Sequence, residues 1–213
     1  MAVIAVLGGT GYAGRHIVKE AVDRGHTVLS IARNVAAERV PGATYVEASL
    51  LDVPDRVTQL QGVDVVVSAV APRGDTLGKV RPAIAELNSV LPGTVRLGIV
   101  GGAGGSHVSP GGPLLVETPE FPADYKAESL EALGILQDLQ ADASGRDWFY
   151  VHPAGGFGAF NPGERTGTYR TGGDVLVVDD AGQSNLSGAD LAVAVVDEIE
   201  TPAHVRDRFT VGY

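Results

Sequence analysis

The sequence contains no cysteine, one methionine and one tryptophan, and aromatic residues make up only 6% of it. Without cysteine, the chain can form no disulfide, use no thiolate nucleophile and bind no metal through sulfur. It also has no apolar run close to the roughly 20 residues that a membrane-spanning helix needs. The N-terminus lacks the basic segment and apolar core of a signal peptide. Together these absences predict a cytoplasmic protein with no membrane partner.

Basic residues are scarce too, with 16 Lys and Arg against 26 Asp and Glu and a net charge of −10. An acidic surface repels polyanions, so we expect no nucleic acid as a partner. A nucleotide is still allowed, because a glycine-rich loop binds phosphate through backbone N–H groups. With 213 residues, of which 44% are hydrophobic, the chain can bury a sizeable core. The expected partner is a small-molecule substrate, and the chain is expected to be a monomer or a homodimer.

Glycine is abundant, with 29 residues, and the first cluster of glycines follows a strand-like segment. Residues 3–7 are all apolar, which is typical of a parallel strand buried on both faces. The sequence Gly8-Gly-Thr-Gly-Tyr-Ala-Gly14 comes next, and residues 15–24 then show helical spacing before Gly25, the expected helix stop. A strand, a glycine turn and a helix in this order predict that the phosphates of a dinucleotide bind at the helix N-terminus.

The motif glycines have separate expected functions. Gly8 permits a tight turn, Gly11 lets a pyrophosphate approach the backbone, and Gly14 lets the helix pack closely on the strand. The helix adds free N–H groups and the positive end of its dipole. An ordinary glycine-rich turn is the alternative interpretation. The cofactor contacts predicted for this loop are Gly8, Thr10, Gly11, Tyr12 and Ala13.

The second predicted strand, residues 26–33, would reach the adenosine ribose at its end. A site that prefers NAD places an acidic residue there, to bind the ribose 2′-hydroxyl. This strand ends in Ala32-Arg33-Asn34, without an acid. Arg33 can make charge-assisted hydrogen bonds to a 2′-phosphate, so the sequence favours NADP(H) over NAD(H). The alternative is that Arg33 is a solvated side chain at the start of a loop.

Two further strand ends are expected along the path of the cofactor. The fourth strand, residues 63–70, ends in small residues that would let the cofactor lie close to the chain, so Ala69, Val70 and Ala71 are predicted contacts. The fifth strand, residues 94–100, runs into a glycine-rich segment that indicates either a close approach or a mobile loop. Gly102 is the contact predicted there.

The rest of the chain alternates strands and helices. Residues 168–170 and 175–178 are expected to pair as a hairpin. The order of elements predicts an α/β fold, a Rossmann-type doubly wound parallel sheet flanked by helices. Residues 1–213 would form one domain, in which residues 154–213 contribute a small substrate-side cap and the last strand. Further strands are expected at residues 43–47, 146–152 and 208–213, and helices at residues 35–40, 55–61, 75–91, 123–143 and 189–200, the last capped by Ser187.

Several segments resemble a known superfamily. The glycine motif, the Ala32-Arg33-Asn34 sequence and Asp64-Val-Val-Val-Ser-Ala69 resemble the atypical short-chain dehydrogenase/reductases. The segments 100–104, 121–126, 162–170, 199–202 and 208–211 are similar to bacterial proteins whose names propose NADH-flavin reductase activity, relatives of biliverdin reductase B and of NmrA-like proteins. The resemblance covers essentially the whole chain. It implies a Rossmann fold that binds NAD(P)H, with the nicotinamide passing Pro153.

The sequence departs from the superfamily at two places. Relatives often carry Gly-Asp after the third strand, near the adenine, whereas this chain has Ala48-Ser49. An adenine contact must therefore come from Ser49 or from the backbone around Leu50. The usual catalytic Tyr-x-x-x-Lys pair is also absent, because Tyr125 is followed at that spacing by Ser129.

The chemistry at the nicotinamide end rests on few candidates. Reducing a flavin needs no strong protein acid, but reducing a carbonyl requires a proton donor within hydrogen-bond reach. Tyr125 could donate a proton or stack on an acceptor, and Lys126 could hold the nicotinamide ribose. The alternative is that Tyr125 is a partly buried aromatic and Lys126 is solvated. His107 and His152 have no partner at ligand spacing, so no metal is expected.

Three functions remain open. The favoured one is an NADPH-dependent oxidoreductase that transfers hydride to a flavin or another planar aromatic acceptor. The second is a non-catalytic, NmrA-like regulatory protein that senses NADP(H). The third is an epimerase, dehydratase or carbonyl reductase acting on a specialised metabolite. The missing Tyr-x-x-x-Lys pair counts against the third, and a glycine-rich lip beside a separate cap, which indicates a substrate pocket, counts against the second.

Overall fold

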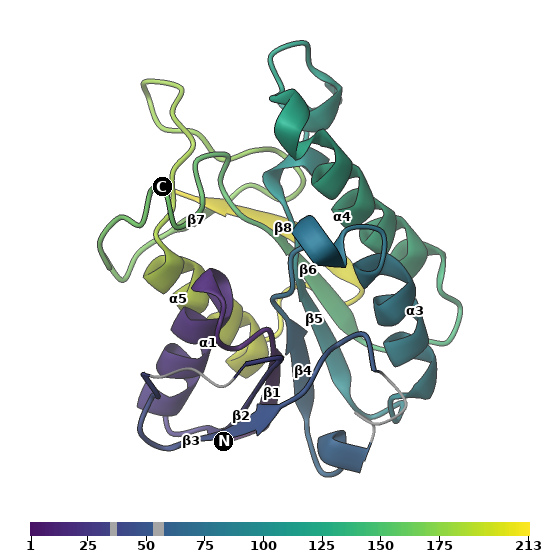
Figure 1. Cartoon of the computed structure of the whole chain (residues 1–213). Coiled ribbons are helices and arrows are strands. Elements are labelled where there is room, and N and C mark those ends of the chain that lie inside the picture. The colour runs from purple at the N-terminus through teal and green to yellow at the C-terminus, as the bar shows by residue number, and fades with distance from the viewer. Residues whose placement is uncertain (35–37, 53–57) are drawn as a thin grey trace.

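A computed structural model describes residues 1–34, 38–52 and 58–213. In this described part of the chain, eight strands form one sheet in the order β3-β2-β1-β4-β5-β6-β8-β7 (Figure 1). The strands pair in parallel, except that β7 is antiparallel to β8. The strands are β1 (Val3–Leu7), β2 (Thr27–Ala32), β3 (Ala43–Glu47), β4 (Val65–Ser68), β5 (Arg96–Val100), β6 (Trp148–His152), β7 (Arg170–Thr171) and β8 (Asp207–Gly212).

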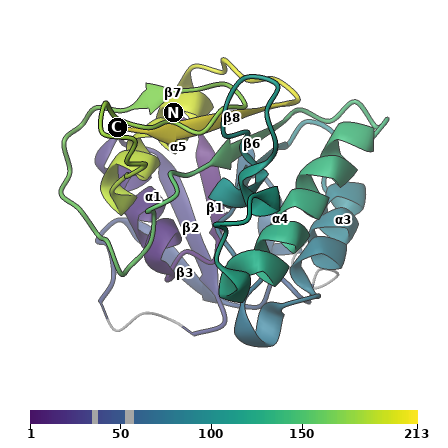
Figure 2. The ribbon, with the colours of Figure 1, turned by 90° about the horizontal axis from the view of Figure 1, so that it is seen from above.

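Helices cover both faces of the sheet (Figure 2). The helices α1 (Tyr12–Asp23) and α5 (Gly188–Glu200) lie on one face, and α3 (Val80–Val90) and α4 (Ala123–Ala141) lie on the other. Successive side chains of a strand point to opposite faces. Accordingly, Ile4 and Val6 of β1 pack in the cluster under α1 and α5, while Ala5 and Leu7 pack in the cluster under α3 and α4. The predicted doubly wound fold is confirmed.

The order of strands decides where a ligand can bind. From β1, the chain proceeds to β2 on one side of the sheet, and then crosses to β4 on the other side of β1. A crevice therefore opens beyond the carboxyl end of β1, where the two crossovers lead in opposite directions. The glycine motif follows β1 at this point.

One predicted helix is interrupted in the structure, and two others fall partly on residues outside the described part of the chain. The helix expected at residues 75–91 is a 3₁₀ turn, Gly74–Thr76, followed by α3 from Val80. Gly78 lies between them with a φ of 78°, a conformation that interrupts a right-handed helix. Residues 35–37 of the helix expected at 35–40 and residues 55–57 of the helix expected at 55–61 lie outside the described residues, while Thr58–Leu60 is a 3₁₀ turn. No helix in the described part of the chain is long and apolar enough to cross a bilayer.

The hairpin expected between residues 168–170 and 175–178 is wrong. Instead, β7 pairs with the last strand, where Arg170 lies opposite Gly212. Val175 forms a parallel bridge with His107, and its carbonyl accepts a hydrogen bond from Thr210 Oγ1 at 2.5 Å. The free edge of β8 thus competes successfully with the local turn, because an edge strand offers a row of unpaired backbone groups.

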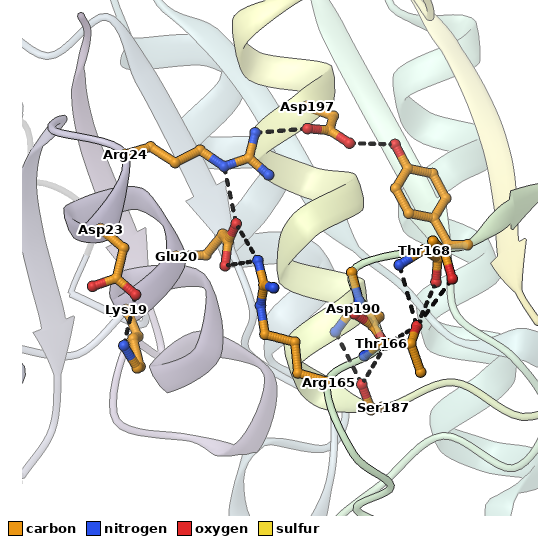
Figure 3. A network of polar contacts seen from close by, with 12 residues as sticks. Lys19, Glu20, Asp23, Arg24, Arg165, Thr166, Thr168, Ser187, Asp190 and Asp197 are labelled. Carbon is orange, nitrogen blue, oxygen red and sulfur yellow. Dashed lines mark hydrogen bonds and ion pairs between the residues drawn. The ribbon is translucent and has the colours of Figure 1, made fainter.

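Polar contacts fasten the segment before β7 to α1 and α5 (Figure 3). Asp190 is fully buried, and its carboxylate accepts hydrogen bonds from Thr166 N and Gly167 N at 2.8 Å each and from the Tyr213 hydroxyl at 2.5 Å. Ser187 caps α5 by accepting from Asp190 N at 3.0 Å, which confirms the predicted N-cap. The chain after β6 is therefore held in place by a buried carboxylate.

Candidate functional site

The turn after β1 requires glycine at several positions. Gly8 has a φ of 76°, and a Cβ there would lie 3.0–3.1 Å from Val70 and Ala69. A Cβ on Gly14 would lie 2.1 Å from the carbonyl oxygen of Gly8. The turn is closed by a hydrogen bond from Gly11 N to Gly8 O at 2.9 Å. The chain therefore passes close to both β4 and α1, as the motif predicts.

The N-terminus of α1 points into this turn without a side chain to satisfy it. Gly11 is the N-cap residue, and no side-chain cap bond is found there among the described residues. The first-turn N–H groups of such a helix have no partner within the helix, and together with the helix dipole they attract an anion. The first turn also carries no acidic residue that would repel one. The cradle thus fits the pyrophosphate of a dinucleotide.

A single cleft of about 680 Å³ runs from this cradle along the carboxyl ends of β2, β1, β4, β5 and β6. It gathers residues that are far apart in the sequence but follow successive strands. Of the predicted cofactor contacts, these line the cleft: Gly8, Thr10, Gly11, Tyr12, Ala13, Arg33, Ser49, Leu50, Ala69, Val70, Ala71, Gly102 and Pro153.

Beside the end of β2, Arg33 lines the cleft and forms an ion pair with Asp75. About half of each side chain or more is exposed, so water screens the pair. The bond to Arg33 lowers the pKa of the Asp75 carboxyl. Ser49 lies beside them, and its hydroxyl accepts a hydrogen bond from Leu51 N at 3.1 Å. The cleft thus carries the exposed Arg33–Asp75 ion pair at the carboxyl end of β2.

Further along, the cleft is bounded by the glycine lip, residues 101–105, which follows β5. A Cβ on Gly101 would lie 2.0 Å from the Tyr150 hydroxyl oxygen, and one on Gly104 would lie 2.8 Å from Ser129 Cβ. Glycine is required at these two positions because side chains of β6 and α4 pack directly beneath the lip. A Cβ on Gly102, by contrast, would meet nothing within 4 Å.

Aromatic rings also line the cleft. Phe121 precedes α4 and Tyr125 lies in its first turn, while Phe157 and Phe160 come from the loop after β6. Phe160 is 73% exposed and Tyr125 is 44% exposed, although both line the cleft. The ring of Phe157 lies 5.3 Å from that of Tyr12, so the aromatic lining is continuous with the glycine motif. Exposed rings in a cleft offer flat apolar surface to a ligand.

Arg73 and Glu128 form a charged pair beside these rings. The Arg73 guanidinium donates two hydrogen bonds to the Glu128 carboxylate, at 2.6 and 2.7 Å, and lies 5.8 Å from the centre of the Tyr125 ring. The bond to Glu128 raises the pKa of Arg73. Because the Arg73 guanidinium already donates two hydrogen bonds to a carboxylate, little of its positive charge is available to an acceptor.

The two predicted catalytic residues are not brought together. Tyr125 lines the cleft, but the residues that line it in the described part of the chain do not include Lys126, which is exposed on α4. Consecutive residues of a helix are rotated by about 100°, and this rotation takes Lys126 out of the cleft lining although Tyr125 belongs to it. Lys126 therefore has no structural support as a ribose contact.

Two buried polar residues lie behind the lip. Ser106, which follows it, and His152 are both fully buried, and neither is among the described residues that line the cleft. No group of three or more His, Asp or Glu that could hold a metal occurs in the described residues. Sequence reasoning missed the contacts of Tyr12, whose hydroxyl donates to Pro162 O at 3.1 Å and accepts from Gly188 N at 3.0 Å. The one feature of the sequence that could indicate these contacts is the presence of a tyrosine within the glycine motif.

The fold and the cleft define a Rossmann-type dinucleotide-binding protein. Comparison with known proteins makes this more specific: the chain belongs to the NAD(P)H-binding family, which matches residues 8–202. It is 36% identical to the uncharacterized protein YwnB of Bacillus subtilis (strain 168), over 98% of this chain and 97% of that protein. The resemblance to atypical short-chain dehydrogenase/reductases and NmrA-like proteins is confirmed.

Two solved structures are similar along the whole chain. One is a Streptococcus pneumoniae protein whose name proposes an NADH-flavin reductase, with 30% identity and a TM-score of 0.85 over 100% of this chain and 99% of that one. The other is a Bacteroides thetaiotaomicron protein whose name proposes an epimerase, with 29% identity and a TM-score of 0.87 over 100% and 97%. The shared family therefore includes proteins named for different reactions.

Proposed function

We propose that the protein is an NADPH-dependent oxidoreductase that transfers hydride to a flavin or another planar aromatic acceptor. The observation that carries this proposal is a single cleft lined both by a phosphate cradle and by the rings of Phe121, Tyr125, Phe157 and Phe160. A dinucleotide anchored at Gly11 extends along the strand ends toward these rings. The name of the Streptococcus relative supports the same reaction class.

Cofactor choice is proposed to depend on Arg33. Because the Arg33–Asp75 pair is exposed and screened, its guanidinium can exchange Asp75 for a 2′-phosphate, which carries more negative charge and accepts more hydrogen bonds. Adenine is proposed to contact Ser49 and Leu50. The cofactor would then pass Ala69, Val70 and Ala71 and reach Gly102 and Pro153 with its nicotinamide.

Nicotinamide supplies the hydride when the cofactor is bound. The residues of the protein bind the phosphates, orient the ring against an acceptor and exclude water from the contact. A flavin can take its proton from solvent, so the reaction needs no protein acid near the lip. Stacking by Tyr125 and Phe160 on a planar acceptor supplies the orientation. Lys126 is not needed in this scheme.

Residues 154–213 are proposed to contribute the substrate-side cap, in particular the loop that carries Phe157 and Phe160. Tyr12 connects this loop to the cofactor motif through Pro162. A bound dinucleotide would therefore touch a segment that also faces the acceptor. A cytoplasmic location stays a prediction of the sequence.

A turnover assay tests the proposed function. Pure protein is mixed with NADPH and FMN, and the loss of nicotinamide absorbance is followed for the wild type, Phe160→Ala and the control Val205→Ala, an exposed apolar residue outside the cleft lining. We expect turnover, with KM for FMN raised about fivefold in Phe160→Ala alone, since aromatic stacking is worth about 1 kcal/mol. No turnover with any flavin or quinone would overturn the proposal.

Two other outcomes distinguish the alternative functions. Tight NADPH binding without any turnover would indicate a sensor of NADP(H). Turnover of a carbonyl substrate that is abolished by Tyr125→Phe would indicate a carbonyl reductase, because the missing hydroxyl would then be the proton donor.

Arg33→Ala tests the choice of cofactor. Arg39→Ala is the control, because Arg39 also lies between β2 and β3 but is not among the described residues that line the cleft. Loss of charge-assisted hydrogen bonds to the 2′-phosphate should raise the Kd for NADPH about tenfold and leave that for NADH unchanged. The measurement is a fluorescence titration with each cofactor. Equal losses for NADPH and NADH would show that Arg33 does not read the 2′-phosphate.

A further inference from the structure

A histidine that the proposed reaction does not use lies behind the glycine lip. His152 ends β6 and is 0% exposed. Its Nδ1 lies 2.8 Å from the carbonyl oxygen of Gly102, within the lip. Since a carbonyl oxygen can only accept, Nδ1 carries the hydrogen and donates it to Gly102. The tautomer of His152 is thereby fixed by the lip itself.

The imidazole of His152 is neutral and does not reach the cleft. Burial lowers the pKa of His152 to about 4, so the ring is uncharged at neutral pH. Its Nε2 is buried without a hydrogen-bond partner among the described residues. A ring with these properties cannot protonate a substrate in the cleft, and its influence on the site passes through the bond to Gly102.

The lip needs such a support, because glycines provide no side chains to hold it. A Cβ on Gly105 would lie 2.7 Å from His152 Cε1, so the ring also fills the space beneath the lip. The Tyr150 ring lies 4.7 Å from the His152 ring and holds it from the side. At the other end of the lip, Arg208 donates to the carbonyl of Gly105 at 2.9 Å. Two side-chain bonds thus fix the two ends of the lip.

The hydrogen bond to His152 also determines how the peptide group between Gly102 and Ala103 is oriented. The peptide bond between Gly102 and Ala103 is trans, so its C=O and N–H point in opposite directions. Holding the Gly102 oxygen toward the buried ring turns the Ala103 N–H away from that ring. Both Gly102 and Ala103 line the cleft. The Ala103 N–H therefore faces away from the ring, on a segment that lines the cleft where the nicotinamide is predicted to lie.

We propose that His152 is a positioning residue that fixes the glycine lip for the nicotinamide half of the cofactor. The proposal rests on the proposed function only in placing the nicotinamide beside Gly102. It makes no demand on which acceptor is reduced. A lip freed from His152 would rotate its peptide groups, and a ligand that relies on them would bind more weakly.

Binding measurements on three variants test this proposal. His152→Leu fills the space but cannot donate, while His152→Asn retains a donor next to the position of Nδ1. The control Phe149→Leu alters a neighbouring residue of β6 that is equally buried but packs on the opposite face of the sheet. Each variant is titrated with NADPH and with 2′,5′-ADP, which carries the adenosine half and the 2′-phosphate but no nicotinamide.

We expect His152→Leu to raise the Kd for NADPH about tenfold, as the loss of one buried hydrogen bond implies, and to leave the Kd for 2′,5′-ADP unchanged. His152→Asn should restore most of the NADPH affinity, and Phe149→Leu should not change the ratio of the two constants. Equal weakening of both ligands by His152→Leu, or no weakening of either, would overturn the proposal, as would a His152→Asn variant as poor as His152→Leu. Intact NADPH binding without FMN turnover would overturn the proposed function alone.

Discussion

Replacing Gly14 with alanine tests how tightly the glycine turn must close against α1. The added Cβ would lie 2.1 Å from the Gly8 carbonyl oxygen, 2.8 Å from the Gly8 carbonyl carbon and 2.9 Å from Gly9 Cα. These are backbone atoms, so no change of rotamer can relieve the contact. To reach 3.0 Å, the lower limit of real Cβ contacts, the turn and the helix must separate by about 0.9 Å.

The separation lowers the stability of the fold, but the substitution also brings a gain in helix propensity. Overpacking of this kind costs about 1–3 kcal/mol, and alanine recovers about 1 kcal/mol over glycine within a helix. For a chain of this size, a net loss of up to about 2 kcal/mol lowers Tm by up to about 8 °C. NADPH binding should weaken more, by about tenfold or greater, because the phosphates contact both the turn and the helix, which have moved apart.

Gly134→Ala is the matched control, since Gly134 also lies within a helix, α4. A Cβ there would lie 2.4 Å from Arg81 Nη1, the end of a flexible side chain that can move aside. We expect unchanged or slightly raised stability and normal NADPH binding. Thermal unfolding and a fluorescence titration with NADPH measure both effects. A Gly14→Ala variant that binds NADPH as well as the wild type would refute the reasoning.

Two further predictions concern stability. Asp190→Asn should lower the free energy of unfolding by about 2–4 kcal/mol, measured in a thermal or denaturant titration. The reason is that an amide nitrogen would face hydrogen-bond donors that now bind the carboxylate oxygens (Figure 3). A loss below the error of the titration would contradict this prediction. Below its ordinary pKa near 6.5, His152 takes up a proton in the unfolded chain but not in the folded one. The free energy of unfolding should therefore fall by about 3 kcal/mol between pH 6.5 and pH 4 on account of this residue. Arg208, Asp174 and His107 also act on the pKa of His152, but less than burial does. His152→Leu should reduce the slope of stability against pH. An unchanged slope in the variant would contradict the assignment of a neutral buried ring.

The parts of the fold that are predictable from the sequence are those determined by local pattern. Residues 3–7 and the glycines after them fix β1, the turn and α1, because burial on both faces and the glycine spacing leave few alternatives. Ser187 identifies the start of α5 for a similar reason. The fold class then follows from the alternation of strands and helices.

The parts that the sequence does not reveal depend on contacts between distant segments. β7 pairs with β8 rather than with the nearby residues 175–178, and a local turn pattern carries no information about a free strand edge. The ion pair of Arg33 with Asp75 joins two segments that are far apart in the sequence, so the sequence of either segment alone does not reveal that the pair forms.

At the site, the strand ends along the cleft could be predicted, but the directions of side chains could not. Tyr125 and Lys126 are adjacent in the sequence, yet only Tyr125 faces the cleft. His152 carries no motif, and its importance appears only when β6 is placed beside the glycine lip. Composition indicates which residues are available, whereas geometry decides which of them act together.

The most direct test of the central claim is a titration of isotope-labelled protein with NADPH, followed by backbone amide NMR signals. A dinucleotide that extends along the cleft should shift the amides of Gly8, Gly11 and Ala13, those of the glycine lip, and that of Phe157, all with one saturable binding curve. The absence of saturable shifts, or shifts confined to residues outside the cleft, would contradict it.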